Sequence, residues 1–397
     1  MSLTTRDPKA PLRLQPGPLA RLQQHGRLDR TLLLAAGALA LIGAVLVWSA
    51  TRTTMIDSGR NPQTYLFRHL LNVIIGAGLL ATSCRVDARI LRLLAPAVYV
   101  ASVLGLVLVF VIGSTVNGAH AWIRIGAGFE IQPAEFMKLA LIVAMAVMFA
   151  ERAKGRPARA RRPEAPPRSS DIVLALLMTV VPLGLIMLQP DLGSAMVLST
   201  AAFGVLVAAG VPARWTIGLI VLGVAGAVLA VKGGMLAQYQ LARFEAFTRP
   251  GADPQGVAYN ITQAHIAIAN GGLFGRGLFH GPQTRGAYVP EQQTDFVYSV
   301  AGEEFGLLGA GLIIALFAVI CWRGLKIAAA ADRTGRIVAA GIVCWFGFQA
   351  FQNIGMNLGL TPVTGLPLPF VSYGGSSMFA QSLALGLLQS VHRRSTS

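Results

Sequence analysis

The sequence predicts an all-α polytopic membrane protein with ten transmembrane helices and both termini in the cytoplasm. Of its 397 residues, 54% are hydrophobic and only 13% are charged, and the mean hydropathy is +0.60. About a quarter of the residues of a typical soluble domain are charged, so this chain cannot cover a water-facing surface with polar side chains. The composition therefore excludes a soluble enzyme, a disordered chain and a nucleic-acid-binding module.

Ten apolar segments meet or approach the length of about 20 residues that a helix needs to cross a bilayer. They are residues 31–50, 66–83, 91–113, 134–150, 171–188, 193–209, 215–231, 303–321, 337–360 and 370–391. The first has no convincing cleavage site and follows a Pro- and Arg-rich tail, so we interpret it as an uncleaved helix. We predict a disordered cytoplasmic tail at residues 1–30, a membrane domain at 31–391 and a cytoplasmic tail at 392–397.

The charges of the connecting loops orient these segments. With an even number of spans and the N-terminus inside, most lysines and arginines fall on the cytoplasmic side, and that side carries the whole formal net charge of +16. This asymmetry is the positive-inside pattern of a multi-pass protein of the cytoplasmic membrane. Arginines that face anionic membrane lipids explain the basic composition, so no nucleic-acid partner is expected.

Cysteines and histidines give no sign of a disulfide or a metal centre. Cys84, Cys321 and Cys344 fall at inner helix ends or inside a helix, away from an oxidising exterior. The six histidines show no spacing typical of metal ligands, so no metal site is predicted from side-chain clusters. Residues 151–170 form a basic, proline-rich cytoplasmic loop, which predicts a disordered linker.

Residues 232–302 form a large extracellular loop between the seventh and eighth segments, far longer than a helix connection requires. Long ordered loops in compact folds are usually functional. Val257, Ile261, Ala264 and Ile268 recur at helical spacing, which predicts a short helix in this loop at the membrane interface.

Four carboxylates lie where this loop enters the eighth segment: Glu291, Asp295, Glu303 and Glu304. Clustered and partly buried carboxylates raise one another's pKa, which suits general-base catalysis. Asp295 precedes the helix and can face a cavity, so it is the candidate catalytic residue. Glu303 and Glu304 fall in the first turns of the helix, where interaction with the helix dipole is a sufficient explanation.

Two further polar positions lie at membrane depth, where each needs a partner or a function. Glu135 and Lys138 are three residues apart on one helix face, either as an ion pair that fixes helix packing or as a contact to a substrate phosphate or a proton. Asp191 follows Gln189-Pro190 and can cap the next helix.

The segment 361–377 contains prolines and glycines that preclude a continuous helix. Its hydroxyl groups lie at the outer mouth of the bundle and can hold a sugar or a diphosphate, or the segment simply crosses the bundle. The candidate binding residues here are Thr364, Ser372, Tyr373, Ser376 and Ser377. Arg276, in a glycine-rich turn of the large loop, can bind phosphate.

Four motifs together resemble one family. They are QPAEFMKL at 132–139, QPDLGSA at 189–195, PEQQTDFVYSVAGEEFG at 290–306 and TPVTGLPLPFVSYGGSS at 361–377. This combination resembles the SEDS family of bacterial shape, elongation, division and sporulation proteins, which includes RodA, FtsW and SpoVE. The resemblance covers residues 31–391 and implies a ten-helix peptidoglycan glycosyltransferase that polymerises lipid II at the outer face of the membrane.

The resemblance also implies roles for particular residues. The family's catalytic aspartate matches Asp295, its Glu/Lys pair matches Glu135 and Lys138, and the tryptophan of its second outer loop matches Trp122, close to Arg124. Members act with a class B penicillin-binding protein, a transpeptidase that crosslinks the nascent glycan strand.

These expectations combine into one mechanism. Asp295 takes the proton of the acceptor GlcNAc 4-hydroxyl, whose oxygen attacks C1 of MurNAc to form a β-1,4 bond with inversion. The departing undecaprenyl pyrophosphate requires cations, from Lys138, Arg276, Arg124 or a divalent ion such as Mg²⁺ or Mn²⁺. The alternatives are a lipid II flippase or transporter, and a non-catalytic scaffold for the transpeptidase.

Overall fold

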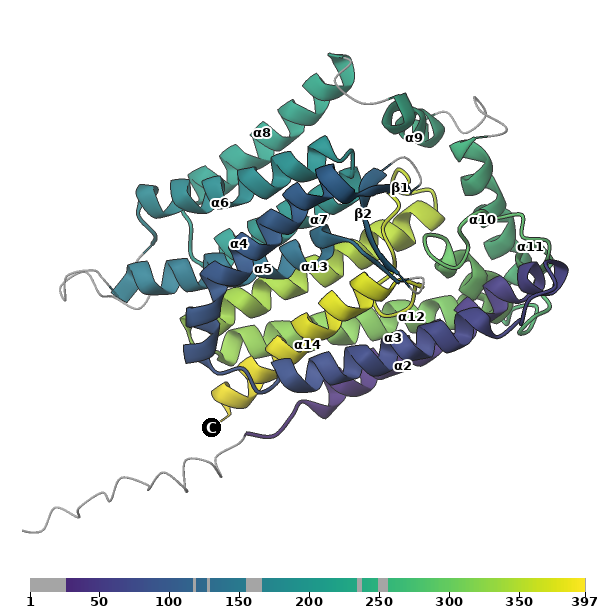
Figure 1. The fold of residues 1–397 in the computed structure, drawn as a ribbon, viewed down its shortest axis with the longest axis horizontal. Helices are drawn as coiled ribbons and strands as arrows, with labels where there is room; N and C mark the ends of the chain where they lie inside the picture. The colour runs from purple at the N-terminus through teal and green to yellow at the C-terminus, as the bar shows by residue number, and fades with distance from the viewer. Residues whose placement is uncertain are drawn as a thin grey trace, which may run out of the picture.

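The computed structural model describes residues 26–116, 119–126, 129–154, 166–233, 238–248 and 256–396, which form a mostly helical bundle (Figure 1). Most of the predicted N-terminal tail and much of the basic linker within 151–170 lie outside the described residues.

Each of the ten predicted apolar segments overlaps a long helix, because each is long enough to close its backbone hydrogen bonds within itself. These helices are α2 (Arg30–Asp57), α3 (Thr64–Ser83), α4 (Ala88–Ile112), α5 (Pro133–Lys154), α6 (Ser169–Leu188), α7 (Leu192–Ala208), α8 (Ala213–Lys232), α12 (Val297–Ala330), α13 (Arg333–Asn357) and α14 (Gly375–Ser395).

Seven of these helices are long and apolar enough to cross a membrane: α2 to α6, α12 and α13. α7 and the apolar part of α8, Ala213–Gly226, are shorter. α14 starts at Gly375 instead of residue 370, because the backbone of Phe370 has a φ of 63° and cannot continue a helix. The count of ten spans and the cytoplasmic termini stay predictions.

A small antiparallel sheet between α4 and α5 corrects the all-α prediction. It consists of β1 (Ser114–Val116), β2 (Ala119–Gly126) and β3 (Phe129–Ile131), in the order β1-β2-β3. β-branched and aromatic residues recur along these short strands, and such residues suit a pleated strand. Figure 1 places β1 and β2 at the end of the bundle where the chain between α13 and α14 also lies.

Three shorter helices form within the large loop: α9 (Gln238–Thr248), α10 (Val257–Gly271) and α11 (Pro282–Arg285). α10 confirms the short helix that the apolar spacing predicts, and it packs against α12. Ala258, Ile261 and Ala264 of α10 are buried in a small apolar cluster with Phe296, directly beside Asp295.

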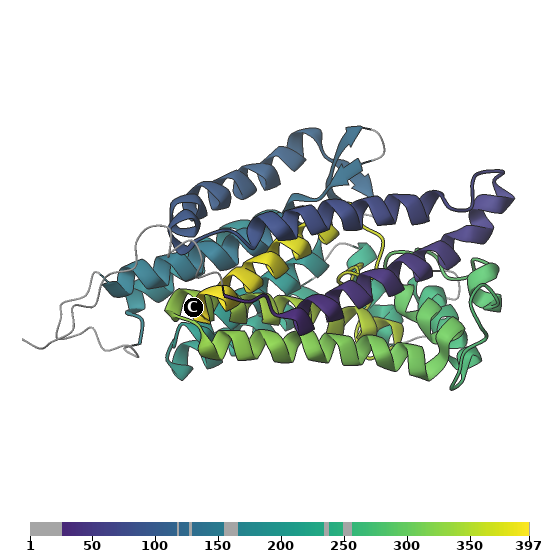
Figure 2. The same cartoon turned by 90° about the horizontal axis from the view of Figure 1, so that it is seen from below.

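α5 is the most buried of the candidate spans, and it packs against α4, α7 and α13. The outer helices α4 and α8 expose many apolar side chains, as helices in contact with lipid tails do. Figure 2 shows α12 and α4 on opposite sides of the bundle, so that the core lies between them.

α12 is interrupted at Gly306, where φ is +64°, a conformation that favours glycine. The chain after α10 lies in this interruption and replaces the missing backbone partners. The Arg276 N–H donates to the Glu303 carbonyl at 2.9 Å, and the Leu307 N–H donates to the Gly272 carbonyl at 2.9 Å. The large loop is therefore attached to the helix that follows Asp295.

Candidate active site

A cavity of 630 Å³ lies at the end of the bundle that carries the sheet and the large loop. Segments from across the chain meet in it: α3, the sheet region, the turn before α7, α9, the loop before α12 and the chain between α13 and α14. Its polar lining residues include Tyr65, Arg68, Asn72, Trp122, Glu130, Gln132, Asp191, Arg243, Glu291, Gln293, Thr294, Asp295, Thr364, Tyr373 and Ser377.

Asp295 lines this cavity and is half-buried just before α12 begins. Burial, followed by the negative charge of Glu291, raises the pKa of Asp295 to about 7. Arg243 and the Thr294 hydroxyl oppose this rise, and the negative charge of Asp191 adds a smaller increase. A carboxyl group with this pKa is partly ionised at neutral pH and can accept a proton from a bound hydroxyl group.

Buried polar side chains hold the backbone at Asp295 in place through hydrogen bonds. The side-chain amides of Asn353 and Asn357 on α13 donate to the Asp295 carbonyl at 2.9 and 3.1 Å. The Ser372 hydroxyl donates to the Thr294 carbonyl and accepts from the Leu368 N–H at 2.8 Å. These side chains are almost fully buried, so they fix the segment relative to α13 and the 361–374 chain.

The remaining carboxylates of the predicted cluster are used differently. Glu291 lines the cavity, whereas Glu303 accepts bonds from the Gln283 and Thr284 N–H groups, both at 2.8 Å. Glu304 accepts bonds from the Ser49 hydroxyl and the Phe279 N–H. The helix dipole alone is therefore the wrong explanation for Glu303 and Glu304, because both carboxylates hold the large loop in place.

The cations in the cavity wall differ from those expected. Arg68 of α3 and Arg243 of α9 line the cavity. Arg124 on β2 does not line the cavity. It forms an exposed ion pair at 3.0 Å with Glu130, and Glu130 does line the cavity. Arg276 is exposed and also lies outside the lining.

The Glu135–Lys138 pair lies inside the bundle and outside the cavity lining. Lys138 Nζ is 2.6 Å from Glu135, and both side chains are at most 1% exposed. Lys138 also donates to Gln349 at 3.3 Å, and Gln349 in turn donates to the Pro367 carbonyl at 2.8 Å. This geometry matches the interpretation as an ion pair that fixes packing; a substrate contact stays a prediction.

The predicted residues of the 361–377 segment divide into two groups. Thr364, Tyr373 and Ser377 line the cavity, and the Tyr373 ring packs edge-on against Tyr65 at 5.1 Å. Ser372 and Ser376 are buried outside the lining.

Asp191 caps α7, as predicted, by accepting from the Ser194 N–H at 2.9 Å. Its other carboxylate oxygen accepts from Gln132 at 2.7 Å, and both side chains line the cavity. The sequence favours capping as the explanation for Asp191, but it does not predict that this residue lies beside Asp295.

Arg68 and Arg243 were also missed as site residues. A signal existed for Arg68, because a charged residue inside an apolar segment is costly and usually functional. None existed for Arg243, which lies in a polar stretch of the large loop.

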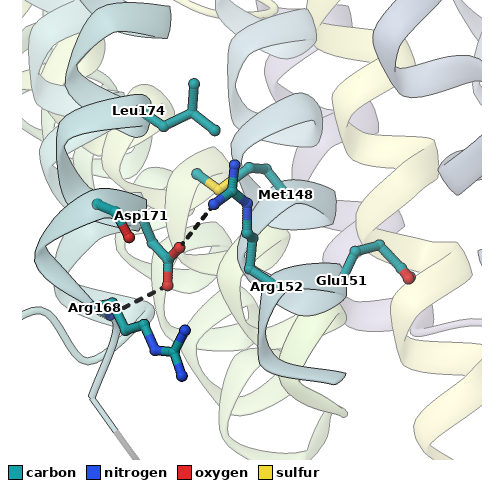
Figure 3. A pocket seen from close by; sticks show the side chains of 7 residues that line it. Met148, Glu151, Arg152, Arg168, Asp171 and Leu174 are labelled. Carbon is teal, nitrogen blue, oxygen red and sulfur yellow. Dashed lines mark hydrogen bonds and ion pairs between the residues drawn. The ribbon is translucent and has the colours of Figure 1, made fainter. Parts of the chain in front are cut away.

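A second pocket, of 540 Å³, lies between the end of α5 and the start of α6 (Figure 3). Arg152 extends from α5 to Asp171 on α6, at 3.4 Å. The backbone N–H of Arg168 also donates to Asp171, at 3.2 Å. This pocket shares no lining residue with the Asp295 cavity.

Comparisons with known proteins agree with the motifs. The family model for the FtsW, RodA and SpoVE cell cycle proteins matches residues 29–397. A probable peptidoglycan glycosyltransferase FtsW of Geobacter metallireducens is 35% identical over 376 residues, covering 94% of this chain and 96% of that protein. Peptidoglycan glycosyltransferase MrdB of Escherichia coli K12 is 33% identical over 366 residues, covering 92% and 93%.

Two solved structures share the fold. One, from a study of how a peptidoglycan synthase complex coordinates polymerization and crosslinking, has a TM-score of 0.75 and 32% identity, covering 93% of this chain and 98% of that one. The other is the Thermus thermophilus rod shape determining protein RodA, with a TM-score of 0.66, 31% identity and coverage of 93% and 98%. The apolar helices and these relatives identify a multi-pass protein of the bacterial cytoplasmic membrane. The chain belongs to the FtsW/RodA/SpoVE family.

Proposed function

We propose that the chain is a peptidoglycan glycosyltransferase that polymerises lipid II at the outer face of the cytoplasmic membrane. The reaction forms β-1,4 links and releases undecaprenyl pyrophosphate. The relatives' names support the reaction class. One observation in the structure carries the proposal: a carboxyl group with a pKa of about 7 lies in a cavity that also contains two arginines.

Asp295 is the proposed general base. It takes the proton of the acceptor GlcNAc 4-hydroxyl, and that oxygen attacks C1 of MurNAc at the reducing end of the growing strand. General-base catalysis typically contributes about 10²–10⁴-fold to a rate. The buried bonds to the Asp295 and Thr294 carbonyls hold this segment still while the sugar binds.

The departing diphosphate needs positive charge, which Arg68 and Arg243 supply in this proposal. Both line the cavity with Asp295, and a guanidinium group can form two parallel hydrogen bonds with phosphate oxygens. These arginines replace Lys138, Arg276 and Arg124 in the proposed role, since those three residues lie outside the lining.

The remaining lining residues support sugar recognition. Trp122, Thr364, Tyr373 and Ser377 provide an aromatic face and hydroxyl groups, which suit the apolar faces and hydroxyls of a sugar. We keep them as substrate-binding residues. In this proposal the chain crosses the membrane ten times and both termini lie in the cytoplasm. The cavity then opens on the outer side.

A divalent cation, Mg²⁺ or Mn²⁺, stays a prediction. Within the described residues no group of three or more His, Cys, Asp or Glu side chains can hold a metal ion. Mg²⁺ is often bound by one or two carboxylates together with substrate phosphates, and Asp191 and Glu291 could supply such carboxylates. A bound ion would add positive charge beside the diphosphate; the steps above use only protein side chains.

We also propose a class B penicillin-binding protein as the partner that crosslinks the nascent strand. The support is the matching chain that comes from a peptidoglycan synthase complex combining polymerization and crosslinking. Membrane lipids surround the exposed apolar faces, and no nucleic acid is involved.

The substitution Asp295→Asn tests the proposal, because it keeps the size of the side chain and removes the base. We expect purified protein in detergent to polymerise lipid II, and the variant to lose about 10²–10⁴-fold in rate. In detergent the substrate does not have to cross a membrane. Polymer formation under these conditions therefore shows an enzyme and not a flippase or a scaffold. A variant as fast as the wild type would overturn the assignment.

A further inference from the structure

The pocket between α5 and α6 lies far from Asp295. α5 begins at Pro133, next to the cavity residue Gln132, and it ends at Lys154, next to the second pocket. Its 22 residues extend about 33 Å at 1.5 Å per residue, close to the thickness of a hydrocarbon core. The glycosyl transfer proposed above therefore does not use this pocket, which lies at the end of the bundle that loop charge assigns to the cytoplasm.

The lining of this pocket changes from apolar to charged in layers. Leu174 and Met148 lie one helical turn deeper in the bundle than the charged residues Asp171 and Arg152 (Figure 3). Arg168 lies at the outermost level, just before α6 begins. A phospholipid has the same order, with acyl chains and glycerol above a phosphodiester, so the pocket matches a lipid at the membrane surface.

The carboxylates of the pocket already have cationic partners in the protein. Glu151 accepts from Lys154 at 2.8 Å and lies 3.7 Å from Arg92. Asp171 accepts from the Arg152 guanidinium group and also from the backbone N–H of Arg168.

Among the described residues, three cations (Arg92, Arg152 and Lys154) therefore pair with the two carboxylates, and Arg168 adds a fourth positive charge, so positive charge is in excess there. Arg168 contributes to this excess directly, because its guanidinium group forms no hydrogen bond or ion pair within the part of the chain that the structure describes. In Figure 3 its side chain extends away from Asp171.

We propose that this pocket binds the headgroup of an anionic phospholipid. The phosphodiester contacts the guanidinium group of Arg168, with Arg152 beside it, and the upper part of the lipid packs against Met148 and Leu174. Basic pockets between the cytoplasmic ends of membrane helices bind such headgroups. Guanidinium groups are suited to phosphate because their donors match its oxygens in pairs. A free phosphate ion would share the charge but not the apolar contacts.

The full-length protein in detergent is the material for the test, with native mass spectrometry as the measurement. It is exposed to equal amounts of phosphatidylglycerol and phosphatidylcholine, and the retained lipids are counted. We expect the wild type to retain phosphatidylglycerol preferentially. Arg168→Ala should lower its occupancy about fivefold, since one basic residue near an anionic surface contributes on this scale. Within the described residues the Arg168 side chain forms no hydrogen bond or ion pair, so this substitution should leave the fold intact.

Two control variants test whether lipid binding depends on the side chain and the position of Arg168. Arg168→Lys keeps the charge but lacks the paired donors, so its lipid occupancy should lie between those of the wild type and Arg168→Ala. Arg214→Ala removes an exposed arginine at the start of α8, outside the pocket, and should leave occupancy unchanged. Equal occupancy in the wild type and Arg168→Ala, or an equal loss in Arg214→Ala, would overturn the proposal. So would inorganic phosphate that displaces the bound phosphatidylglycerol, because the site would then be one for a free anion.

Discussion

The ionisation of Asp295 depends on neighbours that come from separate parts of the chain. Glu291 is four residues away in sequence, whereas Asp191 comes from the turn before α7 and Arg243 from α9. Sequence reasoning could predict the effect of Glu291 because the carboxylates are close in the chain. It could not predict Asp191 or Arg243, since their approach depends on how three distant segments fold together.

The pH dependence of polymerisation follows from this environment. The base is the ionised carboxylate, so the rate should rise with pH through about 7. Glu291→Gln removes the negative charge that raises the pKa of Asp295, and the midpoint should move to lower pH. Asp57→Asn, at the exposed end of α2, removes a negative charge outside the cavity lining and should leave the midpoint in place. A Glu291→Gln midpoint that stays fixed or moves upward would contradict this account.

The arginines offer a second test at the scale of single residues. Arg68→Gln and Arg243→Gln should each reduce polymerisation of lipid II at low substrate by about tenfold or more, because a hydrogen bond to a charged group contributes about 1.5–3 kcal/mol. Arg276→Gln should have little effect, since Arg276 is exposed outside the cavity lining. The measurement is the initial rate against lipid II concentration. A larger loss in Arg276→Gln than in the other two would contradict the role of Arg68 and Arg243 and favour Arg276, one of the cations expected from the sequence.

At the scale of elements, the ten long helices could be predicted because the length of each apolar segment can be read from the sequence. The sheet could not, because β1 and β3 have three residues each and give too little alternation to detect. Nor could the interruption of α12 at Gly306, which depends on the chain around Gly272 reaching the helix and supplying its backbone partners. Short elements are determined by tertiary contacts that local patterns do not contain.

α13 acts on the site through Asn353 and Asn357. Removing either amide leaves the Asp295 carbonyl with one donor fewer and frees the segment to shift. Asn353→Ala and Asn357→Ala should therefore lower kcat, by up to about 10²-fold for a displacement near 1 Å, with a smaller change in KM.

Gln389→Ala is the matched control for these variants. Gln389 is also a fully buried amide, and it exchanges hydrogen bonds with the backbone of Asp29 near the start of α2 and the end of α14. Its loss should lower the melting temperature without lowering kcat. If Asn357→Ala and Gln389→Ala have similar stability and the same kcat, the amides do not position Asp295.

At the scale of the whole molecule, the cavity and the second pocket lie at opposite ends of α5. The charge pattern assigns these ends to opposite sides of the membrane, with the basic end in the cytoplasm. Catalysis on lipid-linked sugars at the outer face requires this orientation, because the cavity must open where the glycan strand is assembled. The proposed function therefore requires that the cavity end of the bundle faces the outer side of the membrane.

Cysteine labelling in intact cells tests that orientation. Ser58 lies in the α2–α3 turn and Arg285 ends α11 in the large loop, while Thr396 follows α14 at the opposite end (Figure 1). In a background where Cys84, Cys321 and Cys344 are replaced by serine, Ser58→Cys and Arg285→Cys should react with a membrane-impermeant maleimide. Thr396→Cys should react only after the membrane is opened. Labelling of Thr396→Cys in intact cells, or protection of Arg285→Cys, would place the Asp295 cavity on the wrong side for lipid II polymerisation.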